Sequence, residues 1–271
     1  MRLSILIRNY NEAKDLKKTL LLIQKQKVSF PYEIVVSDNS STDNSVEVAT
    51  SFGCRVVHNN AKVFSYGQLL NFGIENCGGE FILLLSAHVA LLNEDAIENI
   101  LKPFTDERVA CVCGTSSTNI NMIMQALQPR QLTIADFTEI ADWKKKEIYL
   151  FAAPCGALRK SVWQQIKFDE TLEIMEDRHW NRCVLEAGFT SVFGVRCYYL
   201  YFIVRKPESY RKRAYLESLA MYKVFGKAET VDNFYYRGTK TIFADAFYSL
   251  KNVPAGLYNL LKIYVIRWKK R

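Results

Sequence analysis

Short apolar runs alternate with amphipathic segments along the first 115 residues of the chain. Residues 3–7 and 81–85 are nearly uninterrupted runs of apolar side chains, a pattern typical of buried strands. Between such runs, apolar side chains recur at helical spacing, as at Leu16, Leu20 and Ile23, with lysines on the opposite face. The pattern predicts strands at residues 3–7, 33–36, 55–57, 81–85 and 109–113, and helices at 13–23, 46–52, 67–77 and after an N-cap at Asn93.

This alternation predicts an α/β fold, in which a mostly parallel central sheet is flanked by helices on both faces. Ligands of such sheets bind at the carboxyl ends of the strands. Polar residues follow three of the expected strands, at residues 9–11, 38–40 and 86–88. We therefore expect these three sets to converge at one edge of the sheet.

The second half of the chain is less regular. Residues 116–150 are polar and show weak periodicity, residues 151–157 are small and apolar, and helices are expected around 161–165 and 176–187. From about residue 198 the composition shifts to Tyr, Phe, Lys and Arg. We predict a domain over residues 1–200, followed by a helical, basic and aromatic C-terminal segment over 201–271.

Composition, net charge and motifs limit the classes of function that the chain can have. With 49% apolar and 24% charged residues the chain is typical of a globular protein, and its net charge of +8 favours anionic partners. Neither a nucleic-acid-binding module nor a stacking-aromatic motif is recognised, so we predict no nucleic-acid partner. The first strand is not followed by Gly-X-Gly-X-X-Gly, which argues against a dinucleotide oxidoreductase.

Cysteine usage and apolar runs predict a cytoplasmic protein. The seven cysteines are odd in number and mostly lie in apolar runs, as expected of buried thiols in a reducing compartment. We recognise no signal peptide, and the longest apolar stretch, at residues 81–92, is shorter than the roughly 20 residues of a membrane span. The basic and aromatic residues 258–271 fit either peripheral contact with an anionic membrane surface or a packed C-terminal helix.

Four motifs, in order, resemble those of the family-two glycosyltransferases, which have the GT-A fold. They are SILIRNYNE at residues 4–12, EIVVSDNSSTD at 33–43, GQLLNFG at 67–73 followed by GEFILLL at 79–85, and FDE at 168–170 followed by MED at 175–177. The resemblance covers about residues 1–200. It implies an inverting hexosyl-, N-acetylhexosaminyl- or rhamnosyltransferase that moves a sugar from a nucleotide-diphosphate sugar to a glycan or lipid-linked glycan in surface polysaccharide synthesis.

The resemblance also implies where the donor binds. Asp38 corresponds to the residue that contacts the base, of uridine or thymidine type, and its carboxylate can accept from the base N3–H. Alternatively, Asp38 forms an Asx turn with the polar residues that follow it. The guanidinium groups of Arg8, Arg159 and Arg182 suit a diphosphate, although Arg8 and Arg182 are equally well read as solvated charges. The expected donor-binding residues are Asn9, Tyr10, Asn11, Asp38, Asn39, Asn71, Ser86, His88 and Arg159.

The acidic pair Glu176-Asp177 corresponds to the family's catalytic pair. The resemblance makes Asp177 the general base for the acceptor hydroxyl, with Trp180 and Arg182 on the acceptor side. It divides the domain into a nucleotide-binding half, residues 1–115, and an acceptor half, residues 116–200. Acids that merely stabilise the start of a helix are the structural alternative.

The main departure from the family pattern is Ser-Ala-His at residues 86–88, where most members carry Asp-X-Asp. His88 is therefore a candidate ligand for a divalent metal, Mn or Mg; it can also donate to the diphosphate directly or be structural. The missing acids favour a second function, an inactive GT-A scaffold or sugar-binding subunit of a glycan-assembly complex. The acidic pair at Glu176 and Asp177 favours the enzyme.

Overall fold

The computed structural model describes residues 2–59, 65–117, 129–140 and 149–201, and the single positions 216, 220 and 224. The chain separates into one unit that ends at Ile203 and another that begins at Val204. Most of the expected C-terminal segment, including residues 258–271, lies outside the described residues, and its helical character and membrane contact stay predictions. In the part of the chain that is described, no helix is both long enough and apolar enough to cross a membrane.

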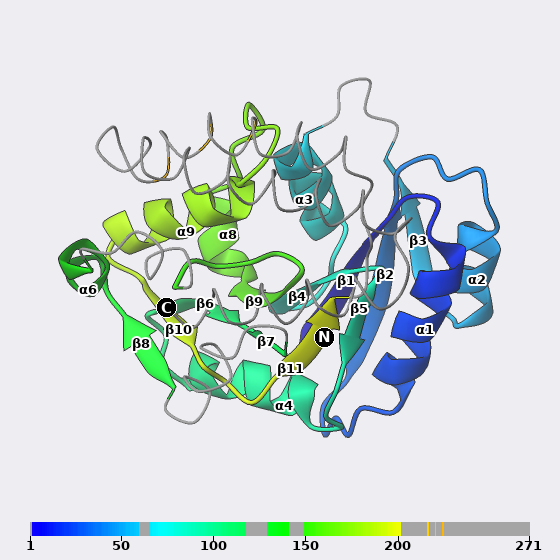
Figure 1. The fold of residues 1–271 in the computed structure, drawn as a ribbon, viewed down its shortest axis with the longest axis horizontal. Coiled ribbons are helices and arrows are strands. Elements are labelled where there is room, and N and C mark those ends of the chain that lie inside the picture. The colour runs from blue at the N-terminus through cyan, green and yellow to red at the C-terminus, as the bar shows by residue number, and fades with distance from the viewer. Residues whose placement is uncertain are drawn as a thin grey trace, which may run out of the picture. The chain divides into compact units, whose positions relative to one another are not determined.

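The first unit is built on an eight-stranded sheet (Figure 1). Its strands are β1 (Leu3–Asn9), β2 (Tyr32–Asp38), β3 (Arg55–His58), β4 (Phe81–Ser86), β6 (Val109–Cys113), β8 (Arg130–Leu132), β9 (Cys155–Arg159) and β10 (Thr190–Phe193). They lie in the order β3-β2-β1-β4-β9-β6-β10-β8. Strands β3, β2, β1 and β4 are parallel to one another, and β6 and β10 are parallel to each other. Strand β9 runs antiparallel between β4 and β6. The predicted mostly parallel α/β sheet is confirmed.

Helices cover both faces of this sheet. One face packs on α1 (Ala13–Gln24), α2 (Ser45–Ser51) and α4 (Ala96–Leu101), which runs into the short 3₁₀ helix η1 (Lys102–Thr105). The other packs on α3 (Tyr66–Glu75), α8 (Lys160–Gln165) and α9 (Glu176–Glu186). Because successive strand residues point to opposite faces, Ile5 joins the first core and Leu6 the second. Both side chains are fully buried, and such burial contributes about 1.5–3 kcal/mol each.

Three short strands form a second sheet beside the end of β4. They are β5 (Val89–Leu91), β7 (Thr115–Ser116) and β11 (Tyr198–Tyr201), with β11 in the middle. Thr19 of α1 donates its hydroxyl to the carbonyls of Ala87 and Val89, at 2.7 and 2.9 Å. The turn between β4 and β5 is thereby attached to α1. A further short helix, α6 (Ile134–Glu139), begins with a capping box between Thr133 and Asp136.

The small, apolar residues 151–157, for which the sequence predicted no element, lead into β9, which enters the sheet antiparallel. One local expectation was wrong. Asn93 does not cap a helix: α4 begins three residues later, at Ala96, with Asp95 in the capping position. The Asn93 side chain instead donates to the carbonyl of Arg196 and to Asp95, because this loop lies against the segment between β10 and β11.

Candidate active site

The carboxyl ends of β1, β2 and β4 lie side by side. In the parallel register Asn9 is opposite Asp38, and Arg8 is opposite both Ser37 and Ser86. The three polar sets that the sequence placed after these strands therefore meet at one edge of the sheet, which we call the donor edge. This edge comprises the strand ends and the loops that follow β1, β2 and β4.

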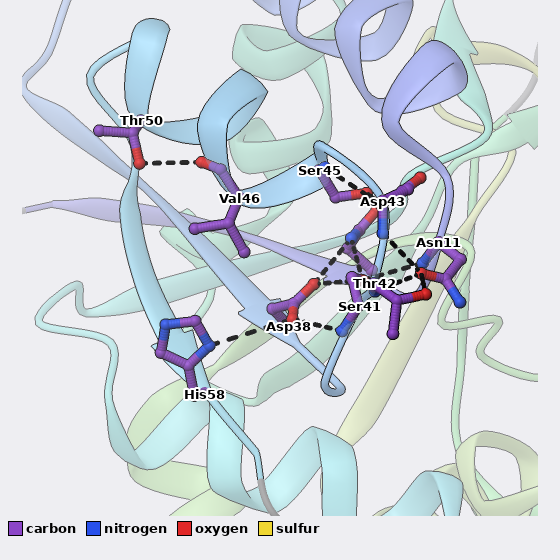
Figure 2. A network of polar contacts seen from close by, with 10 residues as sticks. Asn11, Asp38, Ser41, Thr42, Asp43, Ser45, Val46, Thr50 and His58 are labelled. Carbon is purple, nitrogen blue, oxygen red and sulfur yellow. Dashed lines mark hydrogen bonds and ion pairs between the residues drawn. The ribbon is translucent and has the colours of Figure 1, made fainter.

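Asp38 is the centre of a hydrogen-bond network at the donor edge (Figure 2). Its side chain is buried, with 1% of the residue exposed. Oδ1 accepts from Asn9 Nδ2 at 2.9 Å and from the Ser41 hydroxyl at 2.6 Å, and Oδ2 accepts from the Ser41 backbone N–H at 2.9 Å. This is a local turn made by the Asp38 side chain, as in the alternative that the sequence offered, although the backbone bond reaches three residues on, to Ser41, and not the two of an Asx turn. Asp38 thus shapes its own loop, and its contact with a base stays a prediction.

The loops after β1 and β2 are joined by Asn11. Its side-chain oxygen accepts from the backbone N–H groups of Thr42 and Asp43, at 2.7 and 3.2 Å (Figure 2). Asn11 and Ser40 both adopt the left-handed conformation, with φ of 52° and 60°. Such conformations are costly for residues other than glycine and concentrate at functional sites, so the shape of this loop pair is imposed by its hydrogen bonds.

Asp43 completes the connection between the two loops. Its Oδ2 accepts from the Ala13 backbone N–H at 3.0 Å, and its Oδ1 accepts from the Ser45 backbone N–H at 3.0 Å and from the Ser45 hydroxyl. Burial works to raise the pKa of Asp43, but these hydrogen bonds outweigh it and hold the pKa below its usual value. The carboxylate is therefore ionised at neutral pH and anchors the starts of α1 and α2.

Three side chains beside Asp38 remain accessible. Tyr10 is 57% exposed and Asn39 is partly buried. His58 has a side chain that is 55% exposed, with Nδ1 4.0 Å from Asp38 Oδ2 (Figure 2). The sequence prediction omitted His58, although it ends β3 and the rule applied to the other three strand ends would have included it.

His88 lies at the end of β4 and is 8% exposed. Its Nδ1 lies 2.8 Å from Oε2 of Glu12, the residue directly before α1. The ring packs edge-on against Tyr201 of β11, with 4.5 Å between the ring centroids. Ser86 is buried beside it and donates its backbone N–H to the Pro154 carbonyl at 3.1 Å.

Several buried polar atoms at the donor edge lack a hydrogen-bond partner among the described residues. They are Arg8 Nε, Asn9 Oδ1 and His88 Nε2. A buried polar atom without a partner costs about 1–3 kcal/mol, and folded proteins contain few of them. Two of these atoms are nitrogens and one is an oxygen, and all three lie at the same edge of the sheet. A bound polar ligand would supply the hydrogen-bond or metal-mediated partners that they lack.

The acidic pair lies at the start of α9, next to the donor edge. Glu176 is 4% exposed, with Oε1 3.9 Å from Nη1 of Arg8. Asp177 Oδ2 accepts from the Ala153 backbone N–H at 2.9 Å. Because the neighbouring Pro154 carbonyl binds Ser86, one short loop connects Asp177 to the end of β4. Met175, directly before the pair, has a left-handed φ of 65°.

Three predicted site residues lie away from the donor edge. Arg159 ends the antiparallel β9 and is therefore at the opposite edge, where it donates to the carbonyls of Phe104 and Asp106 at 2.9 and 3.2 Å. Trp180 is fully buried, and its indole N–H donates to the Ile166 carbonyl at 2.6 Å. Both assignments lack support, because these side chains are held inside the protein. Arg182 is partly exposed on α9, where it pairs with Glu186 at 2.7 Å.

Asn71 of α3 is also committed to internal contacts. Its amide nitrogen donates to the Phe168 carbonyl and to Glu170 Oε1, at 3.0 and 2.8 Å. Its oxygen accepts from the Trp163 indole and from the Phe168 backbone N–H, at 2.9 and 3.1 Å. These four bonds use the whole amide, so Asn71 ties α3 to the segment before α9 and leaves no group for a diphosphate.

The described residues contain no group of three or more His, Cys, Asp and Glu side chains that could hold a metal ion by themselves. His88 Nε2 is buried and has no partner among the residues that the structure describes, and a neutral imidazole nitrogen is a common ligand of divalent metal ions. Among the described residues, His88 could thus supply one imidazole ligand to a divalent ion at this edge.

Comparison with known sequences assigns the chain to a family. The model of glycosyl transferase family 2 matches residues 4–167. The O-antigen chain rhamnosyltransferase RfbN of Salmonella typhimurium LT2 is 24% identical over 222 residues, which cover 79% of this chain and 68% of RfbN. The O-antigen chain rhamnosyltransferase WbaN of Salmonella anatum is 24% identical over 174 residues, which cover 61% of this chain and 55% of WbaN.

Solved structures share the fold. The mannosyltransferase PcManGT of Pyrobaculum calidifontis, in complex with GDP-Man and Mn²⁺, superposes with a TM-score of 0.66 at 14% identity, covering all of this chain and 81% of PcManGT. TarS 1–349 of S. aureus, in complex with UDP, gives a TM-score of 0.54 at 17% identity, covering 86% of this chain and 70% of TarS. These likenesses establish the GT-A fold. Together with the family match over more than half of the sequence, they show that the chain is a glycosyltransferase belonging to glycosyl transferase family 2.

Proposed function

We propose that this enzyme transfers a sugar from a nucleotide-diphosphate sugar to a hydroxyl of a glycan or lipid-linked glycan, with inversion, in surface polysaccharide synthesis. The observation that carries the proposal is the set of buried atoms of Arg8, Asn9 and His88 that have no partner among the described residues and lie beside the acidic pair. A diphosphate offers oxygens to the Arg8 N–H and to a divalent ion held by His88 Nε2, and a reaction at the sugar needs a general base nearby. The O-antigen rhamnosyltransferases RfbN and WbaN support the polysaccharide assignment.

The nucleobase of the donor would bind at the Asp38 end of the donor edge. Tyr10 presents an exposed ring on which a base can stack, and His58 and Asn39 supply polar groups next to Asp38. The Asp38 carboxylate would accept from the N3–H of uracil or thymine, which favours uridine or thymidine donors. Asn11 would act through the loop that it holds, because its side-chain oxygen is occupied by Thr42 and Asp43.

The diphosphate would lie toward Arg8, Ser86 and His88. Arg8 brings a guanidinium that is largely buried and close to Glu176, and His88 brings the free Nε2. His88 would hold a divalent ion, Mn²⁺ or Mg²⁺, together with diphosphate oxygens; when bound, such an ion offsets the negative charge on the leaving group. PcManGT, which shares the fold, is in complex with GDP-Man and Mn²⁺, and this supports the use of a divalent ion.

Asp177 would act as the general base. Its carboxylate takes the proton of the acceptor hydroxyl while that oxygen forms a bond to the anomeric carbon. The bond from the anomeric carbon to the diphosphate oxygen breaks on the opposite face, and its electron pair leaves with the diphosphate. The Ala153 backbone N–H fixes one carboxylate oxygen, and Arg8 balances the charge of the neighbouring Glu176.

The donor sugar is proposed as rhamnosyl, hexosyl or N-acetylhexosaminyl, with rhamnosyl favoured by RfbN and WbaN.

A lipid-linked acceptor also fits the basic, aromatic residues 258–271, which we propose hold the enzyme peripherally on the inner face of the membrane. Sedimentation with anionic vesicles tests this: the full chain should bind, and a full-length variant with Gln at Lys262, Arg267, Lys269, Lys270 and Arg271 should bind weakly. Equal sedimentation of the two proteins would contradict membrane contact.

A nucleotide screen followed by a turnover assay tests the function. Thermal unfolding is measured with uridine, thymidine and guanosine diphosphates, each with and without Mn²⁺. A nucleotide at 100 times its Kd stabilises the folded protein by about 2.7 kcal/mol. Release of nucleoside diphosphate from matching nucleotide sugars is then followed with and without glycan acceptors. Binding without any release of product would support the inactive scaffold and contradict the proposal.

A further inference from the structure

Glu12 and His88 form a partly buried pair at the donor edge, although 76 positions separate them in the chain. Glu12 directly precedes α1, and His88 lies in the turn after β4. The Glu12 Oε2 to His88 Nδ1 distance of 2.8 Å is a good hydrogen-bond length. The other ring nitrogen, Nε2, is buried without a partner among the described residues. One nitrogen of this imidazole is thus occupied, and the other is free for a ligand.

The orientation of the ring is fixed from several sides. Glu12 holds Nδ1, and Tyr201 packs edge-on against the ring from β11. The Thr19 hydroxyl bonds to the backbone carbonyls on either side of His88, those of Ala87 and Val89. Because α1 supplies Thr19 and Glu12 lies directly before that helix, the first helix positions both the backbone and the side chain of His88.

The carboxylate of Glu12 also decides where the imidazole proton resides. An ionised carboxylate only accepts hydrogen bonds, so the facing Nδ1 must carry the proton. In the neutral ring, Nε2 then has a lone pair, and a lone pair binds a metal ion but cannot donate to a phosphate oxygen. Histidine metal ligands generally donate their second ring N–H to a carboxylate, carbonyl or water. The contact between Glu12 and His88 has this form.

We infer that Glu12 is a positioning residue, which fixes His88 in the Nδ1–H tautomer so that Nε2 binds the divalent ion of the donor complex. Among the three roles that the sequence left open for His88, this geometry favours the metal ligand over the phosphate donor when the ring is neutral. Glu12 has this role in catalysis only if the enzyme uses the donor proposed above. The tautomer of His88 is nevertheless a property of the protein alone and can be measured without substrate.

Nuclear magnetic resonance of the full chain labelled with ¹⁵N-histidine tests the inference directly. The chain has three histidines, so His88→Gln assigns the ring signals of His88 by their loss. Spectra are recorded while the pH is raised until the His88 signals stop changing, so that the ring is neutral, and the wild type should then show a protonated Nδ1 and an unprotonated Nε2. Addition of Mn²⁺ with uridine diphosphate should broaden the His88 signals more than those of His179. Glu12→Gln should allow the opposite tautomer and raise the Mn²⁺ concentration for half-maximal broadening about 10- to 100-fold.

Matched variants separate this role from a loss of folding. Asp15→Asn removes a carboxylate from the same helix, where it pairs with exposed Lys18, and should leave the His88 signals unchanged. Glu12→Asp keeps the carboxylate and should retain the Nδ1–H tautomer of His88. This variant provides a second measurement of the tautomer if Glu12→Gln unfolds. A wild-type ring protonated on Nε2, or a Glu12→Gln protein with unchanged tautomer and Mn²⁺ response, would overturn the inference. Failure of every nucleotide to bind would instead overturn the proposed function.

Discussion

Arg8 Nη1 lies 3.9 Å from Glu176 Oε1, and this contact joins the end of β1 to the first turn of α9. The Arg8 guanidinium also lies over the Tyr66 ring at the start of α3, 5.3 Å from the ring centroid. The donor edge and the acidic pair therefore share one largely buried cation. Four of the predictions below concern groups at or near this junction, and the last concerns the buried thiols.

Arg8→Lys should weaken binding of a nucleoside diphosphate at least tenfold, as measured by calorimetry. Lysine keeps the charge, but its compact ammonium cannot bridge Glu176 and a ligand as a planar guanidinium does. Arg2→Lys is the matched control, because Arg2 stacks on Phe30 just before β1, at the other end of that strand. Equal affinities in the two variants would show that Arg8 does not face the ligand.

Asp177→Asn should lower the rate of sugar transfer by about 10² to 10⁴ while nucleotide binding and unfolding temperature stay nearly unchanged. Asparagine keeps the side-chain oxygen that accepts from Ala153 but cannot take a proton. Glu186→Gln, at the last position of the same helix, serves as the control. If Asp177→Asn transfers sugar at close to the wild-type rate, the base is elsewhere, and Glu176→Gln is the next variant to measure.

Asp38→Ala should abolish nucleotide binding, and it should also lower the free energy of unfolding, since Asn9 and Ser41 lose their acceptor. Each unpaired buried group costs about 1–3 kcal/mol. Ser41→Ala disturbs the same loop and leaves the carboxylate in place. A direct contact with the base predicts a much larger loss of affinity for Asp38→Ala than for Ser41→Ala. Wild-type affinity in Asp38→Ala would exclude the contact.

Gly67→Ala should destabilise the protein by about 1–3 kcal/mol in denaturant unfolding. A Cβ at Gly67 would lie 2.4 Å from the Asp169 carbonyl oxygen, so α3 would have to move away from the segment that leads to α9. Gly78→Ala is a gentler control, because its Cβ would meet only a Glu33 carboxylate oxygen, at 3.2 Å. Equal destabilisation by both changes would show that α3 has room to move.

Iodoacetamide at pH 8 should modify Cys183 before the other thiols of the folded protein. Burial raises the pKa of Cys54 to about 11 and that of Cys111 to about 12, so roughly one thiol in a thousand or fewer is ionised at pH 8. Cys183 is only partly buried, although its pKa is also raised. For the buried thiols, modification should speed up about tenfold per pH unit below the pKa. Mass spectrometry of the peptides identifies the order, and early labelling of Cys111 would contradict it.

The parallel half of the sheet was predictable because buried parallel strands are almost continuously apolar, as in residues 3–7 and 81–85. The direction of β9 was not predictable, because a short apolar run does not reveal which way a strand enters a sheet. The misplacement of Arg159 follows from this, since an antiparallel strand ends at the opposite edge from its neighbours.

The candidate site was predicted in outline but not in its internal contacts. The sequence identified Asp38 and His88 because both follow strands. It did not reveal that the polar groups of Asn71 and Trp180 are hydrogen-bonded to backbone carbonyls and other groups inside the protein. Nor did it indicate Glu12, because its contact with His88 depends on how α1 packs against the turn after β4.

The position of β9 has a consequence for the order in which the protein is made. β6 lies between β9 and β10, both of which come later in the chain, so it leaves the ribosome before either of its partners exists. The first four strands can pair as they emerge, but residues 109–113 must wait until residue 159 has been added. At about 5–20 residues per second this delay is about 2 to 9 s. During that time the nascent chain exposes an apolar strand, the segment that a chaperone would be expected to cover.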